Sequence, residues 1–172
     1  VKKATLLLFL ILGPCVFGQV DHWERLVDAH DYWKYRLGNS APDSNWTSLN
    51  FSDGNWSSGQ GSIGYGDNDD STTVSNVPSI YMRRSFSVQQ VSDIEALVLH
   101  ADFDDGFVAY LNGVEIARAN VDTIHPKFNT PPASSRESTL HNGVNTWMGG
   151  RPAFWVIQDT IGRGLLQSGT NV

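Results

Sequence analysis

Turn-forming residues divide this chain into short segments, and their spacing restricts the possible fold more than any other feature. From Asp21 onward, Gly, Asn, Asp, Ser or Pro separates short apolar runs. The body has almost no helical periodicity, and the one helical turn that we expect lies near Ile161–Gln167. Turn signals repeated at about 8–12 residues predict an all-β sandwich or barrel.

The clearest predicted element is a β-hairpin centred on Asn112 and Gly113. Ile94–Phe103 is apolar on both alternating faces, which predicts a strand buried on both sides. The turn at residues 104–106 is expected to reverse the chain, so that Phe107–Leu111 runs back and Val114–Ala119 pairs with it. Asn-Gly between apolar runs favours a two-residue hairpin turn because both central residues need a positive φ.

Two further strands are expected upstream, at Tyr32–Leu37 and Ile80–Val88, where polar and apolar residues alternate. Between them, Gly38–Pro78 reads as long polar loops held over the sheet ends by tryptophan side chains. Downstream, Asn120–Asn145 has few apolar residues and reads as one long excursion. In a compact domain such a long connection is usually functional.

The first eighteen residues have the three parts of a secretory signal peptide. Val1–Gly18 begins with two lysines, continues with the apolar run Ala4–Leu12 and ends on a small residue. The run is shorter than the roughly 20 apolar residues of a membrane-spanning helix. Cys15 raises the alternative of a lipid anchor, although Pro14 fits a lipoprotein cleavage site badly. We therefore expect cleavage near Gly18 and a secreted or cell-surface domain over residues 19–172.

Charge and cysteine content exclude several classes of function. The chain has 12 basic and 18 acidic residues, for a net charge of −6, and two of the basic residues lie in the leader. A nucleic-acid-binding surface needs clustered Lys and Arg, which the sequence lacks. The only cysteine is Cys15, so the expected mature domain contains neither a cysteine nucleophile nor a zinc–thiolate site.

The last residues, Leu165–Val172, read as a turn that opens a strand. A natural domain rarely ends by opening a strand, because this leaves an unpaired sheet edge. We therefore expect the chain to be a fragment of a longer protein, with further domains downstream.

Six motifs together carry a family resemblance: Trp33–Tyr35, Asn45–Trp46, Phe51–Trp56, Gly61–Asp67, Tyr81–Phe86 and Asp104–Arg118. They resemble a galactose-binding-like jelly-roll module found at the N-terminus of secreted bacterial CotH (spore-coat-protein-H-like) kinase family proteins. Similar modules precede secreted metallophosphoesterases. The resemblance covers about Trp23–Val172 and implies an antiparallel jelly-roll β-sandwich with one more strand, and a kinase-like domain, beyond Val172. It carries over no catalytic residue.

The expected function is that of a non-catalytic accessory module that binds carbohydrate or another cell-surface polymer. The alternative is a structural spacer that packs against a downstream CotH-like kinase or metallophosphoesterase domain and has no ligand of its own. We expect no enzyme activity in this segment, because its sequence shows no activated nucleophile, acid–base pair, phosphate-binding loop or metal triad.

Trp147 and Arg151 are the candidate ligand-binding residues. Exposed tryptophan rings stack on the apolar faces of sugars, and an arginine can donate to sugar hydroxyls. The alternative is that aromatic rings of this segment fill the core, and this is the favoured interpretation for Phe154–Ile157.

Asp67, Asp69 and Asp70 are the candidate metal ligands, in a glycine-rich loop dense in side-chain oxygens. Ca²⁺ takes six to eight oxygen ligands. Galactose-binding-like folds often carry a structural Ca²⁺, so the family resemblance favours this cofactor. The alternative is a solvated acidic turn.

The remaining titratable residues give weaker indications. The histidines are scattered, without metal-ligand spacing, and are expected to be solvated or satisfied by hydrogen bonds: His22, His30, His100, His125 and His141. Of these, His100 lies in the strand predicted to be buried, where a bond to backbone is expected. Three nearby carboxylates are compatible with glycoside hydrolysis, but Asp104 and Asp105 belong more naturally to a turn, which leaves Asp102.

Overall fold

The structure, a computed structural model, describes residues 24–66, 68, 70–136, 153–157 and 164–172, the segment 153–157 as backbone only. Strands are the main regular secondary structure of these residues. Helix is limited to the 3-10 turn η1 (Val91–Asp93) and to residues 164–165, inside the segment where the sequence predicts a helical turn. The prediction of an all-β chain is confirmed.

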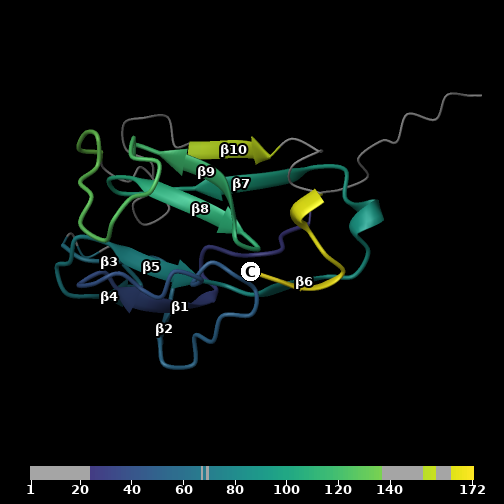
Figure 1. Ribbon diagram of the computed structural model, residues 1–172, viewed down its shortest axis with the longest axis horizontal. Helices are drawn as coiled ribbons and strands as arrows, with labels where there is room; N and C mark the ends of the chain where they lie inside the picture. The colour runs from purple at the N-terminus through teal and green to yellow at the C-terminus, as the bar shows by residue number, and fades with distance from the viewer. Residues whose placement is uncertain (1–23, 67, 69, 137–152, 158–163) are drawn as a thin grey trace, which may run out of the picture.

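The strands lie in two layers (Figure 1). The lower layer contains the antiparallel order β2–β1–β5, made of Ser57–Gln60, Tyr32–Leu37 and Ile80–Arg83, and the pair β6–β11, made of Phe86–Val88 and Gly169–Asn171. The upper layer contains the antiparallel pairs β7–β10, made of Leu97–Ala101 and Ala153–Ile157, and β8–β9, made of Phe107–Leu111 and Val114–Ala119. A short parallel pair, β3 (Ile63–Gly64) and β4 (Thr72–Thr73), lies at one end of the lower layer.

The predicted β8–β9 hairpin is confirmed. Both strands have the predicted bounds, and Leu111 pairs with Val114 across the turn. Asn112 and Gly113 have φ angles of 50° and 91°, the left-handed values that this turn requires. The prediction of β1 at Tyr32–Leu37 is also confirmed.

Three predictions about the other strands need correction. The segment 80–88 is not one strand, since Arg84 and Ser85 separate β5 from β6 and the two halves pair with different partners. Gly38–Pro78 is not only loop, because it contains β2, β3 and β4. β7 pairs with β10, so the turn at 104–106 does not close a β7–β8 hairpin.

The prediction that β7 is buried on both sides is wrong. Its apolar residues are half-buried and His100 is exposed. Apolar residues on both faces of a strand show only that both faces can be buried. How far they are buried depends on which other elements pack against each face.

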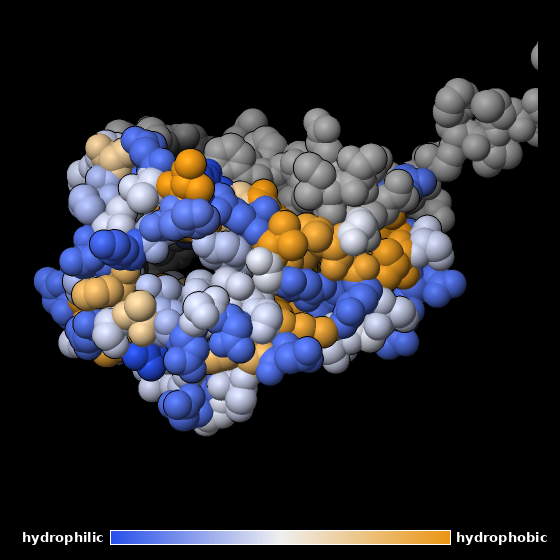
Figure 2. Space-filling view, in the orientation of Figure 1, coloured by the Kyte–Doolittle hydropathy of each residue, from blue (hydrophilic) through white to orange (hydrophobic). Residues whose placement is uncertain are grey.

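Two clusters join the layers. Val88, Leu111 and Leu166 form the buried apolar core, with half-buried residues packed around it: Leu26, Phe86, Val91, Ile94, Leu97, Ile116 and Leu165. On the face seen in Figure 2, apolar residues gather toward the β6 end, whereas polar residues cover the end that holds β3 and β4.

The second cluster is aromatic and centres on Trp46. Its ring meets Tyr81 of β5 at 5.2 Å and Tyr110 of β8 at 5.6 Å, both edge to face, and stacks on buried Trp56 at 6.2 Å. Burial raises the pKa of both tyrosines. Trp46 therefore connects a strand of each layer, as expected for a loop held down by tryptophan.

Asn171 fixes the β11 end of the chain to the hairpin turn. Its side chain is fully buried. Its Oδ1 accepts from Asn112 Nδ2 at 2.8 Å and from the Gln167 amide at 2.9 Å, while its Nδ2 donates to the carbonyls of Gln167 and Gly169. Asn112 also accepts from the Val172 amide at 2.9 Å and donates its own amide to the Val172 carbonyl at 2.8 Å.

Replacing Asn171 with Asp should lower the free energy of unfolding by about 2–4 kcal/mol, because a buried charge would replace a neutral amide that both donates and accepts. Urea unfolding followed by tryptophan fluorescence measures the change. Thr170→Ala is the matched control, since Thr170 is an exposed neighbour on the same strand, and it should change the value by less than about 0.5 kcal/mol. Equal losses in the two variants would contradict the role given to Asn171.

Candidate ligand pocket

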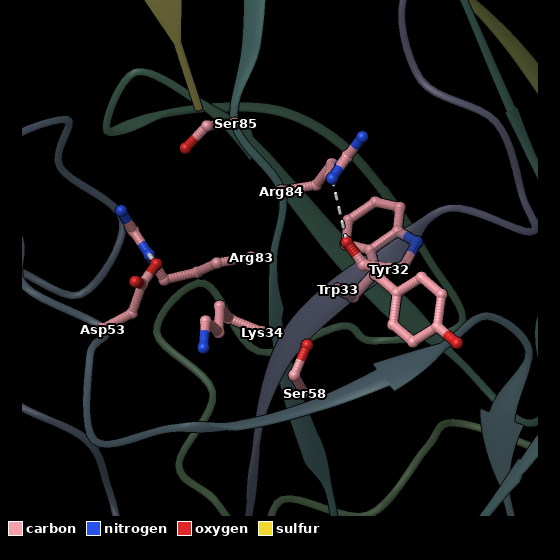
Figure 3. A pocket seen from close by; sticks show the side chains of 8 residues that line it. All are labelled: Tyr32, Trp33, Lys34, Asp53, Ser58, Arg83, Arg84 and Ser85. Atoms are coloured by element: carbon pink, nitrogen blue, oxygen red, sulfur yellow. Dashed lines mark hydrogen bonds and ion pairs between the residues drawn. The ribbon is translucent and has the colours of Figure 1, made fainter.

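A pocket of about 320 Å³ opens on the strands β1, β2 and β5 (Figure 3). This volume lies at the lower end of the range of about 300–1,000 Å³ usual for small-molecule sites. The lining combines basic, aromatic and hydroxyl side chains with one carboxylate: Tyr32, Trp33, Lys34, Asp53, Ser58, Arg83, Arg84 and Ser85.

The strand register brings the polar centre of this pocket together. Lys34 of β1 lies directly opposite Ser58 of β2 and directly opposite Arg83 of β5. Residues directly opposite each other in a sheet point to the same face, so these three side chains share one side of the sheet. Figure 3 shows the Lys34 ammonium between Ser58 and the Arg83–Asp53 pair.

Arg83 is held in place by its own partners and is only 5% exposed. Its Nε donates to Asp53 Oδ2 at 2.9 Å, and its Nη1 donates to the carbonyls of Trp46 and Ser48. The guanidinium also lies over the Phe51 ring, 5.1 Å from its centroid. Arg83 therefore anchors the loop of residues 46–53 against the sheet, and Asp53 offsets its charge.

Arg84 is also paired. Its Nη2 lies 3.2 Å from Asp31 Oδ2, and its Nη1 donates to the Tyr32 carbonyl at 3.0 Å, the bond drawn in Figure 3. Asp31 in turn accepts from the Asp28 amide at 3.0 Å, so the turn of residues 28–31 supports Arg84.

Lys34 is different, since its ammonium makes no hydrogen bond or ion pair with the residues that the structure describes. It is half-buried at the centre of the pocket. With Asp53 paired to Arg83 and Asp31 paired to Arg84, its ammonium is the one uncompensated charge of the lining. A local excess of positive charge is unexpected on a chain whose net charge is −6.

Two aromatic residues complete the pocket. Tyr32 is 64% exposed, so most of its ring is open to solvent at the edge of the pocket. Trp33 is half-buried, and its Nε1 lies so close to Gly61 that a Cβ there would be 3.3 Å from it and would collide with the Ala29 carbonyl oxygen. Gly61 is therefore required for the close approach of the chain to the Ala29 carbonyl beside Trp33.

Most of the sequence-predicted site residues lie outside the described residues: Trp147, Arg151, Asp67 and Asp69. The predicted signal peptide, Val1–Gly18 with Cys15, also lies outside them. Asp70 is described and half-buried, and its carboxylate lies over Gly64, where a Cβ would be 2.5 Å from Oδ2. Within the described ranges, no three His, Cys, Asp or Glu side chains are placed to hold a metal ion. The Ca²⁺ site depends on Asp67 and Asp69 and stays a prediction.

The other titratable candidates take part in local contacts or are exposed. Asp105 accepts from the Arg136 amide at 2.7 Å, and Asp102 lies 3.6 Å from the guanidinium of the same residue. His30 Nδ1 lies 3.3 Å from Asp28 Oδ1. His125 is exposed, and His22 and His141 lie outside the described residues.

The sequence interpretation did not identify this pocket. A usable signal was present in the alternation of Tyr32–Leu37, which places Tyr32, Lys34 and Arg36 on one face of a strand. A polar, basic face on a strand in the middle of a three-stranded sheet indicates that the face is left for a ligand or covered by polar loops.

Comparison with known proteins adds no assignment, because no protein-family model, curated protein or solved structure matches the chain. The resemblance to the CotH-associated module therefore stays a prediction. A search of the described residues finds no helix with the length and apolar character needed to cross a membrane.

Replacing Arg83 with Met should lower the free energy of unfolding by about 3–5 kcal/mol, since Asp53 and two carbonyls would lose a buried donor. Urea unfolding provides the value. Arg25→Met is the matched control, because its side chain is 76% exposed, and it should cost less than about 0.5 kcal/mol. A cost for Arg83→Met as small as that of the control would show that the loop does not depend on this guanidinium.

The turn that supports Arg84 should lose stability in acid. The His30 amide, followed by the Arg25 side chain, lowers the pKa of Asp28 from 3.8 to about 2. A lowered pKa stabilises the folded chain above about pH 4, and this contribution is lost as the pH falls toward 2. A ¹³C NMR titration of the Asp28 carboxyl should give the low pKa directly. It should remain below 3.8 in Arg25→Ala, because the backbone amide is the larger cause, and a return to 3.8 would assign the shift to Arg25.

Proposed function

We propose that this chain is a secreted, non-catalytic jelly-roll module that binds carbohydrate or another cell-surface polymer through the pocket on β1, β2 and β5. The observation that carries the proposal is the exposed ring of Tyr32 at a pocket that also presents an unpaired ammonium. Secretion rests on the leader-like sequence Val1–Gly18.

The chemistry of the lining suits a sugar. Aromatic rings stack on the C–H faces of sugar rings, and the Tyr32 ring is available for this contact. The exposed hydroxyls of Ser58 and Ser85 can donate to and accept from sugar hydroxyls, and Lys34 supplies three donors.

The surroundings of the pocket favour binding over catalysis. Arg83 and Asp53 neutralise each other, and the described part of the lining contains no histidine, cysteine or second carboxylate. Acid–base catalysis of glycosyl transfer commonly uses a pair of carboxyl groups. One stacked ring and a few hydrogen bonds give an expected Kd near about 1 mM, or roughly −4 kcal/mol.

The two residues predicted from sequence, Trp147 and Arg151, remain a second candidate contact, with Ca²⁺ at Asp67, Asp69 and Asp70 ordering the neighbouring loop. A module that uses them would bind through a late loop and not through β1. Variants of Tyr32 and Trp147 therefore separate the two sites.

Tyr32→Ala should weaken polysaccharide binding at least about tenfold, because the stacking surface is removed. Affinity electrophoresis against a panel of soluble polysaccharides, followed by calorimetry, measures the effect. Tyr65→Ala is the matched control, since Tyr65 is also exposed, at 44%, but lies outside the pocket. Loss of binding only in Trp147→Ala would move the site to the late loop. Absence of binding across the panel would favour the spacer alternative.

A further inference from the structure

We infer that the sugar recognised by this pocket is acidic, and that Lys34 selects it by pairing with a carboxylate or sulfate oxyanion. The inference rests on the proposed function and names the class of its ligand. It follows from the charges of the lining, taken one at a time.

The first step is the imbalance of charge on one face of the sheet. Lys34 and Arg83 lie directly opposite each other on adjacent strands, and like charges in this position destabilise a sheet. Asp53 offsets only one of them, because its Oδ2 accepts from Arg83 Nε at 2.9 Å. An anion bound beside Lys34 would offset the charge that Asp53 leaves uncompensated.

The second step is the state of Lys34 itself. A solvated lysine normally extends into water, whereas Lys34 is half-buried between Ser58 and the Arg83–Asp53 pair. Its ammonium has no acceptor among the described residues. An oxyanion in the pocket can therefore form a charge-assisted hydrogen bond with it, which is roughly twice as strong as a bond between neutral groups.

The third step is the geometry of the neighbours. Ser58 lies across from Lys34 on β2, so its hydroxyl can donate to the same oxyanion. Arg84, whose side chain is 35% exposed, is the third cation of the lining and is paired with Asp31. Tyr32 lies two residues from Lys34 on the same strand and lines the same pocket, so one ligand can contact both the ring and the ammonium.

The test compares matched oligosaccharides on the full chain by calorimetry at low salt. Tetragalacturonate is the carboxylate probe, its methyl ester is the neutral probe, and a sulfated galactan oligomer is the sulfate probe. The intact chain should bind at least one acidic probe about tenfold or more tightly than the neutral ester. The preference should shrink in 0.5 M NaCl, where charges are screened over a few ångströms.

Lys34→Gln should abolish the preference for the acidic probes, so that the ratio of acidic to neutral affinities falls from about tenfold to about one. Lys127→Gln is the matched control, because Lys127 is exposed and lies outside the pocket. The thermal midpoint of the ligand-free Lys34→Gln variant should equal or exceed that of the intact chain, since a like-charge contact is removed. This result would also show that the variant is folded.

The outcomes separate the two proposals. Equal binding of the acidic and neutral probes would overturn the inference and leave the proposed function intact. An acidic preference that persists in Lys34→Gln would overturn the assignment to Lys34. No binding of any probe, together with no binding across the polysaccharide panel, would overturn both. The ranking of the carboxylate and sulfate probes identifies which oxyanion the pocket takes.

Discussion

The buried guanidinium of Arg83 is the interaction on which the rest of the structure depends. It joins a long polar loop to β5, an outer strand of the three-stranded sheet, by donating to the carbonyls of Trp46 and Ser48, and Asp53 offsets its charge. The same loop carries the Trp46 ring that contacts a tyrosine of each layer. Because a buried charge is stable only with its partners, the loop, the sheet and the contact between layers are held by one group. The same contacts fix one side of the pocket, since Arg83 both holds the loop and lines the pocket.

The sequence predicts those parts of the fold whose cause is local. Alternation over six residues gives β1, and the Asn112–Gly113 pair gives the β8–β9 hairpin, because each pattern needs no distant partner. The sequence-based prediction is wrong where the bounds of a strand depend on its pairing with a distant strand. The Ser- and Gly-rich β2 is a strand because it lies along β1, and the segment 80–88 breaks where its pairing changes from β1 to β11. The exposure of His100 has the same origin, since hydropathy shows what can be buried and not what covers it.

Prediction of the site is limited in the same way. Tyr32 and Lys34 lie two residues apart in the sequence, but Ser58 and Arg83 reach them only through the register of three strands. A single sequence does not give the register of strands that are joined by loops of this length. The sequence therefore indicates the basic face of β1, but it does not indicate the pocket that forms on that face. The burial and contacts of Asn171 also cannot be predicted from the neighbouring residues, because a polar residue near a turn is normally exposed. The candidate metal ligands and the candidate ligand-binding residues Trp147 and Arg151 rest on residue types in local segments. Of all these residues, only Asp70 lies within the described structure.

The contact between Asn112 and Asn171 also has a consequence for the order in which the chain folds. The two residues are 59 positions apart, and the Arg83–Trp46 contact spans 37. Loop-closure entropy must be overcome before such contacts form, so folding should take milliseconds to seconds, as for other β-sandwiches. The β8–β9 hairpin closes locally and can form within about 1–10 μs. Its turn can therefore form before the long-range contacts, and the hydrogen bond between Asn112 and Asn171 follows when β11 reaches it.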